Sequence, residues 1–167
     1  MRTLFIGSAF AIVVVSLAAC GADSSANSQS EQAVQRQADL YAIDQIEKTW
    51  HRATSTQNVD LMMSLFAPNA TYTIGPGQTF VGKKQIRQFW LKAPVFQPGY
   101  HWVSETPAYK IRITANGDKG TLYFECHYVD PKTKKVVAVV GADQQVAKID
   151  GRWLVTNHVG ATPKLSP

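Results

Sequence analysis

Hydrophobic residues recur at steps of three and four between residues 33 and 55, and this period predicts a long helix. The face that they form holds Leu40, Ile43, Ile46, Trp50 and Ala53. A second helix is expected from Asn58, a favoured N-cap, to just before Pro68, which cannot continue a helix. A third, short helix is expected between Gly82 and Pro94. The first part of the chain is therefore predicted to be helical, apart from a hairpin near residues 70–81.

Beyond Tyr100 the period of the pattern changes from about four to two. Apolar and polar residues alternate in residues 109–113 and 122–128, as in strands with one buried face. Three turn signals divide this part of the chain into four strands: Asn116-Gly117, Asp130-Pro131 and Asp150-Gly151. The predicted fold class is α+β, a cone-shaped, curved antiparallel sheet covered by three N-terminal helices.

The first twenty residues have the pattern of an export signal. Met1 and Arg2 give a positive start, and the apolar residues 4–15 that follow are too few for a stable membrane anchor. Small residues then lead to Cys20, and the sequence LAAC at 17–20 resembles the lipobox of bacterial lipoproteins. The resemblance implies that residues 1–19 are removed and that Cys20 carries the lipid, palmitate included. An ordinary cleaved signal with a coincidental cysteine is the alternative.

The predicted domain organisation follows from these patterns. Residues 20–32 are rich in serine and almost free of apolar side chains, which predicts a flexible, lipidated tether. Residues 33–162 form one cone domain, and residues 163–167 are a C-terminal tail. The protein is expected at the cell membrane or outer membrane, anchored by the lipid on Cys20 and facing the periplasm or exterior.

Charge and cysteine content narrow the possible partners. The formal charge of +5 falls to +4 without Arg2, from 16 basic and 12 acidic residues, and the basic residues form no large surface. Nucleic acid is therefore not an expected partner. Once Cys20 is acylated, Cys126 has no intrachain partner, and its apolar neighbours predict a buried thiol. No metal, glycine-rich phosphate loop or other cofactor motif is visible.

Several segments resemble one known family. These are LFAPNATY at residues 65–72, Gly82 at the start of a short helix, and DGRW at residues 150–153 before a final strand. They are similar to the nuclear transport factor two-like superfamily, and to its SnoaL-like and ketosteroid isomerase-like branches in particular. The resemblance implies a cup-shaped domain. Its members include isomerases, dehydratases, cyclases, hydrolases and binding proteins, so the function has to come from the pocket.

Strand alternation predicts which residues face that cup. If Asp150 and Gly151 form a two-residue turn, Asp143 lies opposite His158 and on the same face as Leu122 and Phe124. Continuing the count back along the chain brings His101 to that face and leaves His127 on the other, as a surface or dimer-interface histidine. We therefore expect His101, Asp143 and His158 as a catalytic acid–base set: His101 as base or acid, Asp143 as its orienter or as a hydrogen-bond donor, His158 as a second polar group.

The resemblance supports this set in part. Asp143 falls where ketosteroid isomerases keep an oxyanion-stabilising acid, and His101 falls near a histidine of scytalone dehydratase-like members. However, Ile74 stands where the isomerases carry their proton-abstracting aspartate, and Trp50 where they carry a hydroxyl donor. Ser55 stands where the dehydratases carry an acid. Steroid isomerase chemistry is therefore not expected.

The predicted ligand is small and apolar or partly polar. Five residues are expected to bind it: Trp50, Phe66, Phe89, Leu122 and Phe124. Each of these functional assignments has a purely structural alternative. Asp143 and His158 could form a hydrogen-bonded pair that satisfies two buried polar groups, and His101 could be hydrogen-bonded to the backbone. The tryptophans could be core, and a cup filled by Trp50, Phe66 and Phe89 would leave no room for a substrate.

Three functions remain open at this point. The first is a lipid-anchored envelope protein that binds a small molecule in its cone, with possible acid–base catalysis. The second is a noncatalytic envelope module whose cone and outer sheet face serve homodimerisation or docking. The third is a metal-independent isomerase, dehydratase or cyclase that works through His101 and Asp143.

The anchor is tested by Cys20→Ser. This variant should leave the membrane fraction, because the acylated thiol is the proposed attachment point. Cys126→Ser is the matched control and should stay with the membranes. Ultracentrifugal fractionation measures both, and retention of the Cys20→Ser variant in the membrane fraction would contradict the proposed anchor.

Overall fold

The computed structural model describes residues 22–96, 111–130 and 132–162. The predictions for the signal at residues 1–19, for Cys20, His101 and the tail at 163–167 lie outside these residues. The chain divides into two compact units, Met1–Ala33 and Val34–Pro167. In the first unit, the described residues are helical and belong to α1 (Ala22–Ser55). None of the described helices is long and apolar enough to cross a membrane.

The start of α1 differs from the flexible segment predicted for residues 20–32. The helix continues back to Ala22 because no proline or glycine interrupts residues 22–55. The side chain of Asn27 donates a hydrogen bond to Glu31, one turn on, at 3.2 Å. Residues 27–32 are exposed, so this first part of the helix buries little surface.

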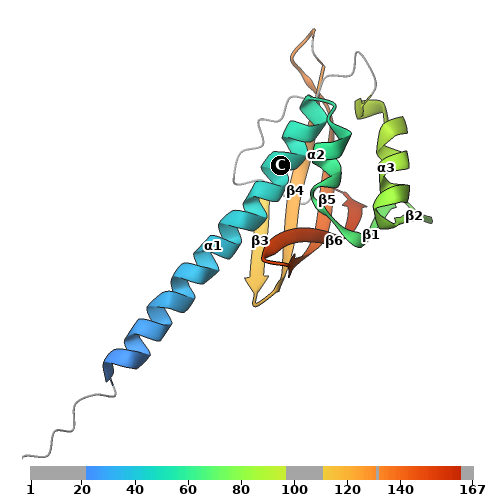
Figure 1. Cartoon of the computed structure of the whole chain (residues 1–167). Helices are drawn as coiled ribbons and strands as arrows, with labels where there is room; N and C mark the ends of the chain where they lie inside the picture. Colours follow the sequence, from blue (N-terminus) through green and yellow to red (C-terminus); the bar gives the residue numbers. More distant parts are fainter. Residues whose placement is uncertain (1–21, 97–110, 131, 163–167) are drawn as a thin grey trace, which may run out of the picture. The chain divides into compact units, whose positions relative to one another are not determined.

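Six strands form one curved sheet in the second unit, in the order β2-β1-β6-β5-β4-β3 (Figure 1). Their bounds are β1 Phe66–Ile74, β2 Gln78–Val81, β3 Ile111–Asn116, β4 Lys119–Val129, β5 Val136–Ile149 and β6 Arg152–Ala161. All neighbours are antiparallel except β1 and β6, which run parallel. The predicted α+β class is confirmed.

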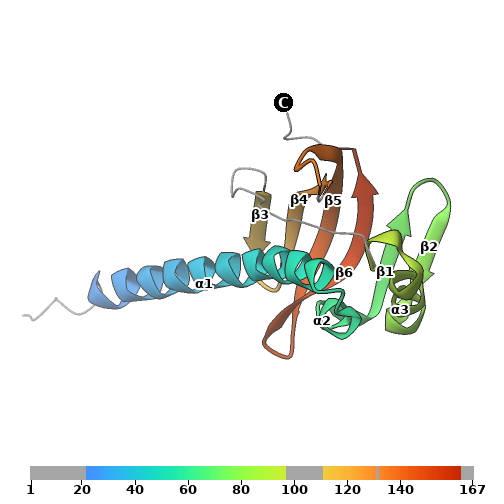
Figure 2. The same ribbon diagram turned by 90° about the horizontal axis from the view of Figure 1, so that it is seen from above.

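Helices cover one face of this sheet, as Figure 2 shows for α3 (Gly82–Lys92) and for the part of α1 that belongs to the same unit, from Val34 on. The contact of α1 is close where Gly120 lies on β4, because a Cβ added there would come within 3.1 Å of the Ile43 side chain. Ile43, Ile46, Trp50 and Ala53, four of the five residues on the predicted apolar face of α1, are buried. We call the covered face of the sheet its concave face.

The second helix, α2 (Val59–Met63), is shorter than predicted. Its N-cap is as expected, since the backbone N–H of Leu61 donates to the Asn58 side chain at 2.9 Å. The helix ends early because the residues that follow it pair with the sheet. The N–H of Val155 donates to the carbonyl of Leu65 at 2.8 Å, and Phe66 then pairs with Val155.

The hairpin between β5 and β6 begins in the predicted register. Ile149 faces Arg152, and the turn residues Asp150 and Gly151 both have positive φ, as this type of two-residue turn requires. The predicted pairing of Asp143 with His158 is wrong, however. The register shifts after Val146–Val155, leaving Thr156 as an extra residue on β6, so His158 faces Gln144.

A second shift moves β5 against β4. Tyr128 pairs with Ala138 but Val129 pairs with Val136, which places one extra residue on β5. The predicted placement of Asp143 on the same face as Leu122 and Phe124 is therefore wrong. Leu122 faces Gln144, and Asp143 faces Tyr123. On the other side of β4, Leu122 pairs with Ile113 of β3.

Asp39 links α1 to the sheet through hydrogen bonds to side chains of β5 and β6. Its Oδ1 accepts hydrogen bonds from Trp153 Nε1 and Lys148 Nζ, both at 2.9 Å, and from Gln35 Nε2 at 3.2 Å. The Trp153 hydrogen bond, followed by the Lys148 and Gln35 bonds, holds the pKa of this carboxyl below its usual value. The folded state therefore favours the ionised carboxylate.

Replacing this residue tests the link. Asp39→Asn should lower the free energy of unfolding at pH 7 by about 1 kcal/mol, because the charge-assisted bonds weaken. Since the folded pKa lies below the unfolded one, the contribution is full above about pH 4 and is lost as the pH falls further. Urea denaturation at pH 7 and pH 3 should therefore give a difference that shrinks at low pH. Asp150→Asn, in an exposed turn, is the control; an equal effect from it would contradict the assignment.

Candidate functional site

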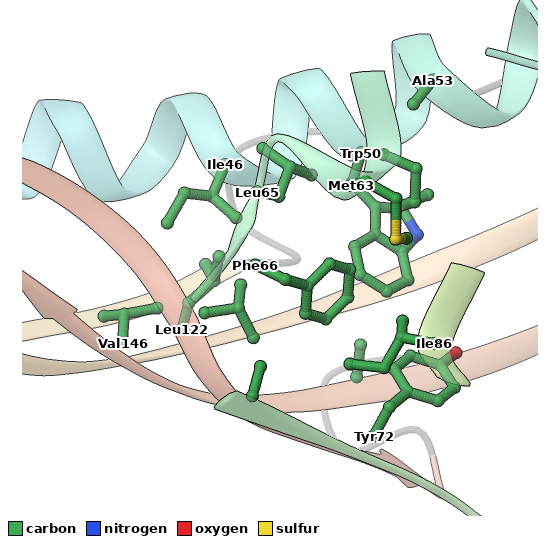
Figure 3. Packing of buried hydrophobic residues seen from close by; sticks show 14 of the residues in the cluster. Ile46, Trp50, Ala53, Met63, Leu65, Phe66, Tyr72, Ile86, Leu122 and Val146 are labelled. Atoms are coloured by element: carbon green, nitrogen blue, oxygen red, sulfur yellow. The ribbon is translucent and has the colours of Figure 1, made fainter. Parts of the chain in front are cut away.

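The concave face is centred on the indole of Trp50, which projects from α1 toward the sheet (Figure 3). Five rings lie around it, with centroids 5.1–6.3 Å from its own: Phe66, Tyr72, Trp90, Phe124 and His158. Four predicted ligand-binding residues are buried here: Trp50, Phe66, Leu122 and Phe124. The fifth, Phe89 on α3, is half-buried and contacts Tyr72. Aromatic side chains thus occupy much of the predicted cup.

His158 lies within this aromatic cluster. Its ring is nearly parallel to that of Tyr72, at 4.2 Å and 7°, and to that of Trp50, at 5.1 Å and 12°. Burial among apolar rings removes water from the imidazolium and lowers the pKa of His158 to about 3. The imidazole is therefore neutral at physiological pH, so it serves as a hydrogen-bonding group and is a weak base.

Gln144 holds this imidazole from the neighbouring strand. Its Nε2 donates to Nδ1 of His158 at 3.2 Å, which places the ring proton of His158 on Nε2. The other amide atom, Oε1, is buried without a hydrogen-bond partner among the described residues, and so is Nε1 of Trp90. Buried polar atoms of this kind are normally satisfied, so the acceptor and the donor are both available to a water molecule or a ligand.

A second polar group comes from α1 itself. Nδ1 of His51 donates to Oε1 of Glu47 at 2.5 Å, and both side chains are about 95% buried. On the other side of the ring, Nε2 of His51 lies 3.8 Å from Sγ of Cys126 on β4. The carboxylate fixes the orientation and tautomer of the imidazole, as in many acid–base sites.

This pair was missed by the sequence reasoning, although a signal was present. Glu47 and His51 are four residues apart, and each directly follows a residue of the predicted buried face, Ile46 and Trp50. The i, i+4 spacing brings two such side chains together on a helix. The predicted buried face of the helix consisted of apolar residues alone and so did not include Glu47 and His51.

Two further protonated groups lie on this side of the sheet. Burial raises the pKa of the Tyr72 phenol well above its usual value, and the nearby Cys126 adds to the effect. Burial also raises the pKa of the Cys126 thiol, which confirms the predicted buried thiol and makes it a poor nucleophile. Both groups are hydrogen-bond donors at neutral pH.

The predicted catalytic set is not assembled as expected. His158 is on the concave face, but Asp143 pairs with Tyr123 and so lies on the opposite face of the sheet. His101 is outside the described residues. The opposite face has its own buried contact, since the Tyr123 hydroxyl donates to Glu125 at 2.9 Å. Among the residues described, no three His, Cys, Asp or Glu side chains are grouped to hold a metal ion.

The environment of His158 is tested by the pH dependence of stability. The unfolded chain takes up a proton at this histidine below about pH 6.5, whereas the folded chain does so only near pH 3. The stability is therefore full above pH 6.5 and falls between these values, by about 1 kcal/mol per pH unit. In urea denaturation from pH 7 to pH 4.5, His158→Gln should show a smaller loss than the parent protein. Parallel losses in the two proteins would contradict a neutral, desolvated His158.

Many solved structures share this fold, and the three that follow are distant from this chain in sequence. An NTF2-like protein of unknown function from Pseudomonas putida KT2440 superposes with a TM-score of 0.66 at 16% identity, over 76% of this chain and 88% of that one. A ketosteroid isomerase-like protein from Erwinia carotovora atroseptica gives 0.56 at 16%, over 77% and 98%. A proposed dehydratase of the NTF2-like family from Streptomyces avermitilis gives 0.57 at 10%, over 78% and 99%.

These similarities show the fold alone. Comparison with curated proteins found no match. The sequence model of the SnoaL-like domain matches residues 48–155, which include the end of α1, α3 and most of the sheet. The chain therefore belongs to the SnoaL-like domain family.

Proposed function

We propose that this protein binds a small, mostly apolar carbonyl compound at the concave face and transfers a proton on it through His51. The observation that carries the proposal is the buried 2.5 Å contact between His51 and Glu47, beside an aromatic cluster that contains protonated donors. The isomerase-like and dehydratase descriptions of two proteins with this fold agree with such chemistry. Both reactions move a proton next to a carbonyl or hydroxyl group.

The roles follow from the protonation states. Glu47 accepts a hydrogen bond from Nδ1–H of His51, which leaves Nε2 as the basic atom; Nε2 can take a proton from a carbon adjacent to a carbonyl. The Cys126 thiol is only a weak partner for Nε2 at 3.8 Å, so a substrate can replace it. The Tyr72 hydroxyl stays protonated and can donate to the enolate oxygen that develops. The proton then returns from Nε2 to the same or a neighbouring carbon.

His101 and Asp143 enter this proposal differently from His51. Asp143 lies on the other face of the sheet and supplies no group to the concave site. His101 remains a candidate second acid or base, because the alternation of side chains along the strands predicts that it faces the cup. His158 acts as a neutral donor through Nε2, oriented by Gln144.

A noncatalytic binding module is the second candidate, and the packing of Trp50 favours it. This one side chain already contacts five other rings, which leaves little of the cup for a large substrate. In that case the concave residues would stabilise the domain, and the outer sheet face would serve homodimerisation or docking. The two candidates differ in one respect, which is whether His51 exchanges protons with a bound ligand.

We also propose that the protein works at the cell envelope. The LAAC sequence at residues 17–20 supports a lipid on Cys20, as set out above. The site would then face the periplasm or the exterior and meet small molecules there.

The proton transfer is tested with 2-tetralone, a small apolar ketone, in D2O. The protein should accelerate exchange of its α-hydrogens, measured by NMR, and His51→Gln should reduce the protein-dependent rate at least tenfold, since a positioned base contributes about 100-fold or more. Glu47→Gln should reduce it less, because the base remains but loses its orienting carboxylate.

His127→Gln is the matched control, since it removes a histidine whose strand position lies on the other face. It should leave the exchange rate unchanged. Binding of 2-tetralone without protein-dependent exchange would support the noncatalytic module and overturn the proton transfer. Equal rates in the parent and His51→Gln proteins would have the same meaning.

A further inference from the structure

A hollow lies at the edge of the sheet, between β2 and α3, which are neighbours in Figures 1 and 2. Its volume is about 730 Å³, within the range of small-molecule sites. The described residues that line it are Gln78, Phe80, Lys84, Gln85, Gln88, Phe89, Lys92, Ala93 and Pro94. None of the residues assigned above to proton transfer is among them.

Phe80, Phe89, Ala93 and Pro94 give this hollow an apolar part. The rings of Phe80 and Phe89 lie 5.0 Å apart, and Phe89 packs at 5.1 Å against Tyr72 on the inner side. Ala93 and Pro94 extend the apolar surface beyond the end of α3. Phe80 and Phe89 are only half-buried, so their exposed surface is available for a ligand to cover.

Two of the described lining residues, Lys84 and Lys92, are positively charged. Lys84 and Lys92 stand eight residues apart on α3, which corresponds to about 12 Å along the helix axis. No acidic residue is among the described lining residues. Neither lysine forms an ion pair with any residue that the structure describes. In contrast, Arg87 on the same helix is paired with Asp60. The first turn of α3 also lacks an acidic residue, which leaves its helix dipole unopposed near Lys84.

We infer that this hollow binds a small organic anion, an apolar chain or ring that carries a carboxylate. The apolar body would cover Phe80 and Phe89, and the carboxylate would pair with Lys84 or Lys92 at the rim. Gln78, Gln85 and Gln88 provide amide donors at the same rim. This site is independent of the proton transfer proposed at His51.

Dodecanoate is the probe, with dodecan-1-ol as the uncharged match. Calorimetry on the full chain should show that dodecanoate binds at least tenfold more tightly than dodecan-1-ol. The double variant Lys84→Gln/Lys92→Gln should lose this preference and keep the weaker binding of the alcohol. The control Lys132→Gln/Lys135→Gln removes the same charge from an exposed turn and should keep the preference.

Three results would overturn the inference. The first is equal affinity for acid and alcohol in the parent protein, and the second is an equal loss in both double variants. The third is binding to phosphatidylglycerol vesicles that depends on Lys84 and Lys92 without any binding of dodecanoate, which would assign the charge to a membrane surface. His51→Gln should leave dodecanoate binding unchanged, so failure at one site is distinguishable from failure at the other.

Discussion

The packing of Trp50 against the concave face is the constraint on which the rest of the structure depends. Its indole joins α1 to rings from β1, α3, β4 and β6, four elements that are far apart in the sequence. Each aromatic contact contributes about 0.5–1.5 kcal/mol beyond simple burial, so the set holds the helix in one position on the sheet. That position brings Glu47 and His51, on either side of Trp50 in the sequence, to the same buried layer.

The same packing determines the chemistry that this layer can carry. Desolvation keeps His158, Tyr72 and Cys126 neutral, which turns them into hydrogen-bonding groups. Only His51 has a carboxylate in contact with its ring among the described histidines of the concave face. An apolar cup with one oriented imidazole and neutral donors suits proton transfer on an uncharged carbonyl compound, whereas the lysine-rimmed hollow beside α3 suits an anion. The two sites would therefore select ligands of different charge.

Much of the fold could be predicted from the sequence because it follows from local rules. Four features depend only on residues close together in the sequence: the helical period around Trp50, the Asn58 cap, the start of α3 at Gly82 and the turn at Asp150. The site was less predictable because it depends on register. One extra residue at Thr156 and another on β5 move Asp143 to the other face and bring Gln144 to His158, and no local pattern signals either bulge. Glu47 and His51 could have been found from their spacing.

The central claim is that His51 is held by Glu47 with its proton on Nδ1 and its basic Nε2 toward the concave interior. Long-range ¹H–¹⁵N correlation spectroscopy of the histidine rings at pH 7 measures this most directly. The account predicts a protonated Nδ1 and an unprotonated Nε2 for His51, with the Nδ1 proton strongly deshielded and lost from that position in Glu47→Gln. A His51 ring with its proton on Nε2, or one whose spectrum is unchanged by Glu47→Gln, would contradict it.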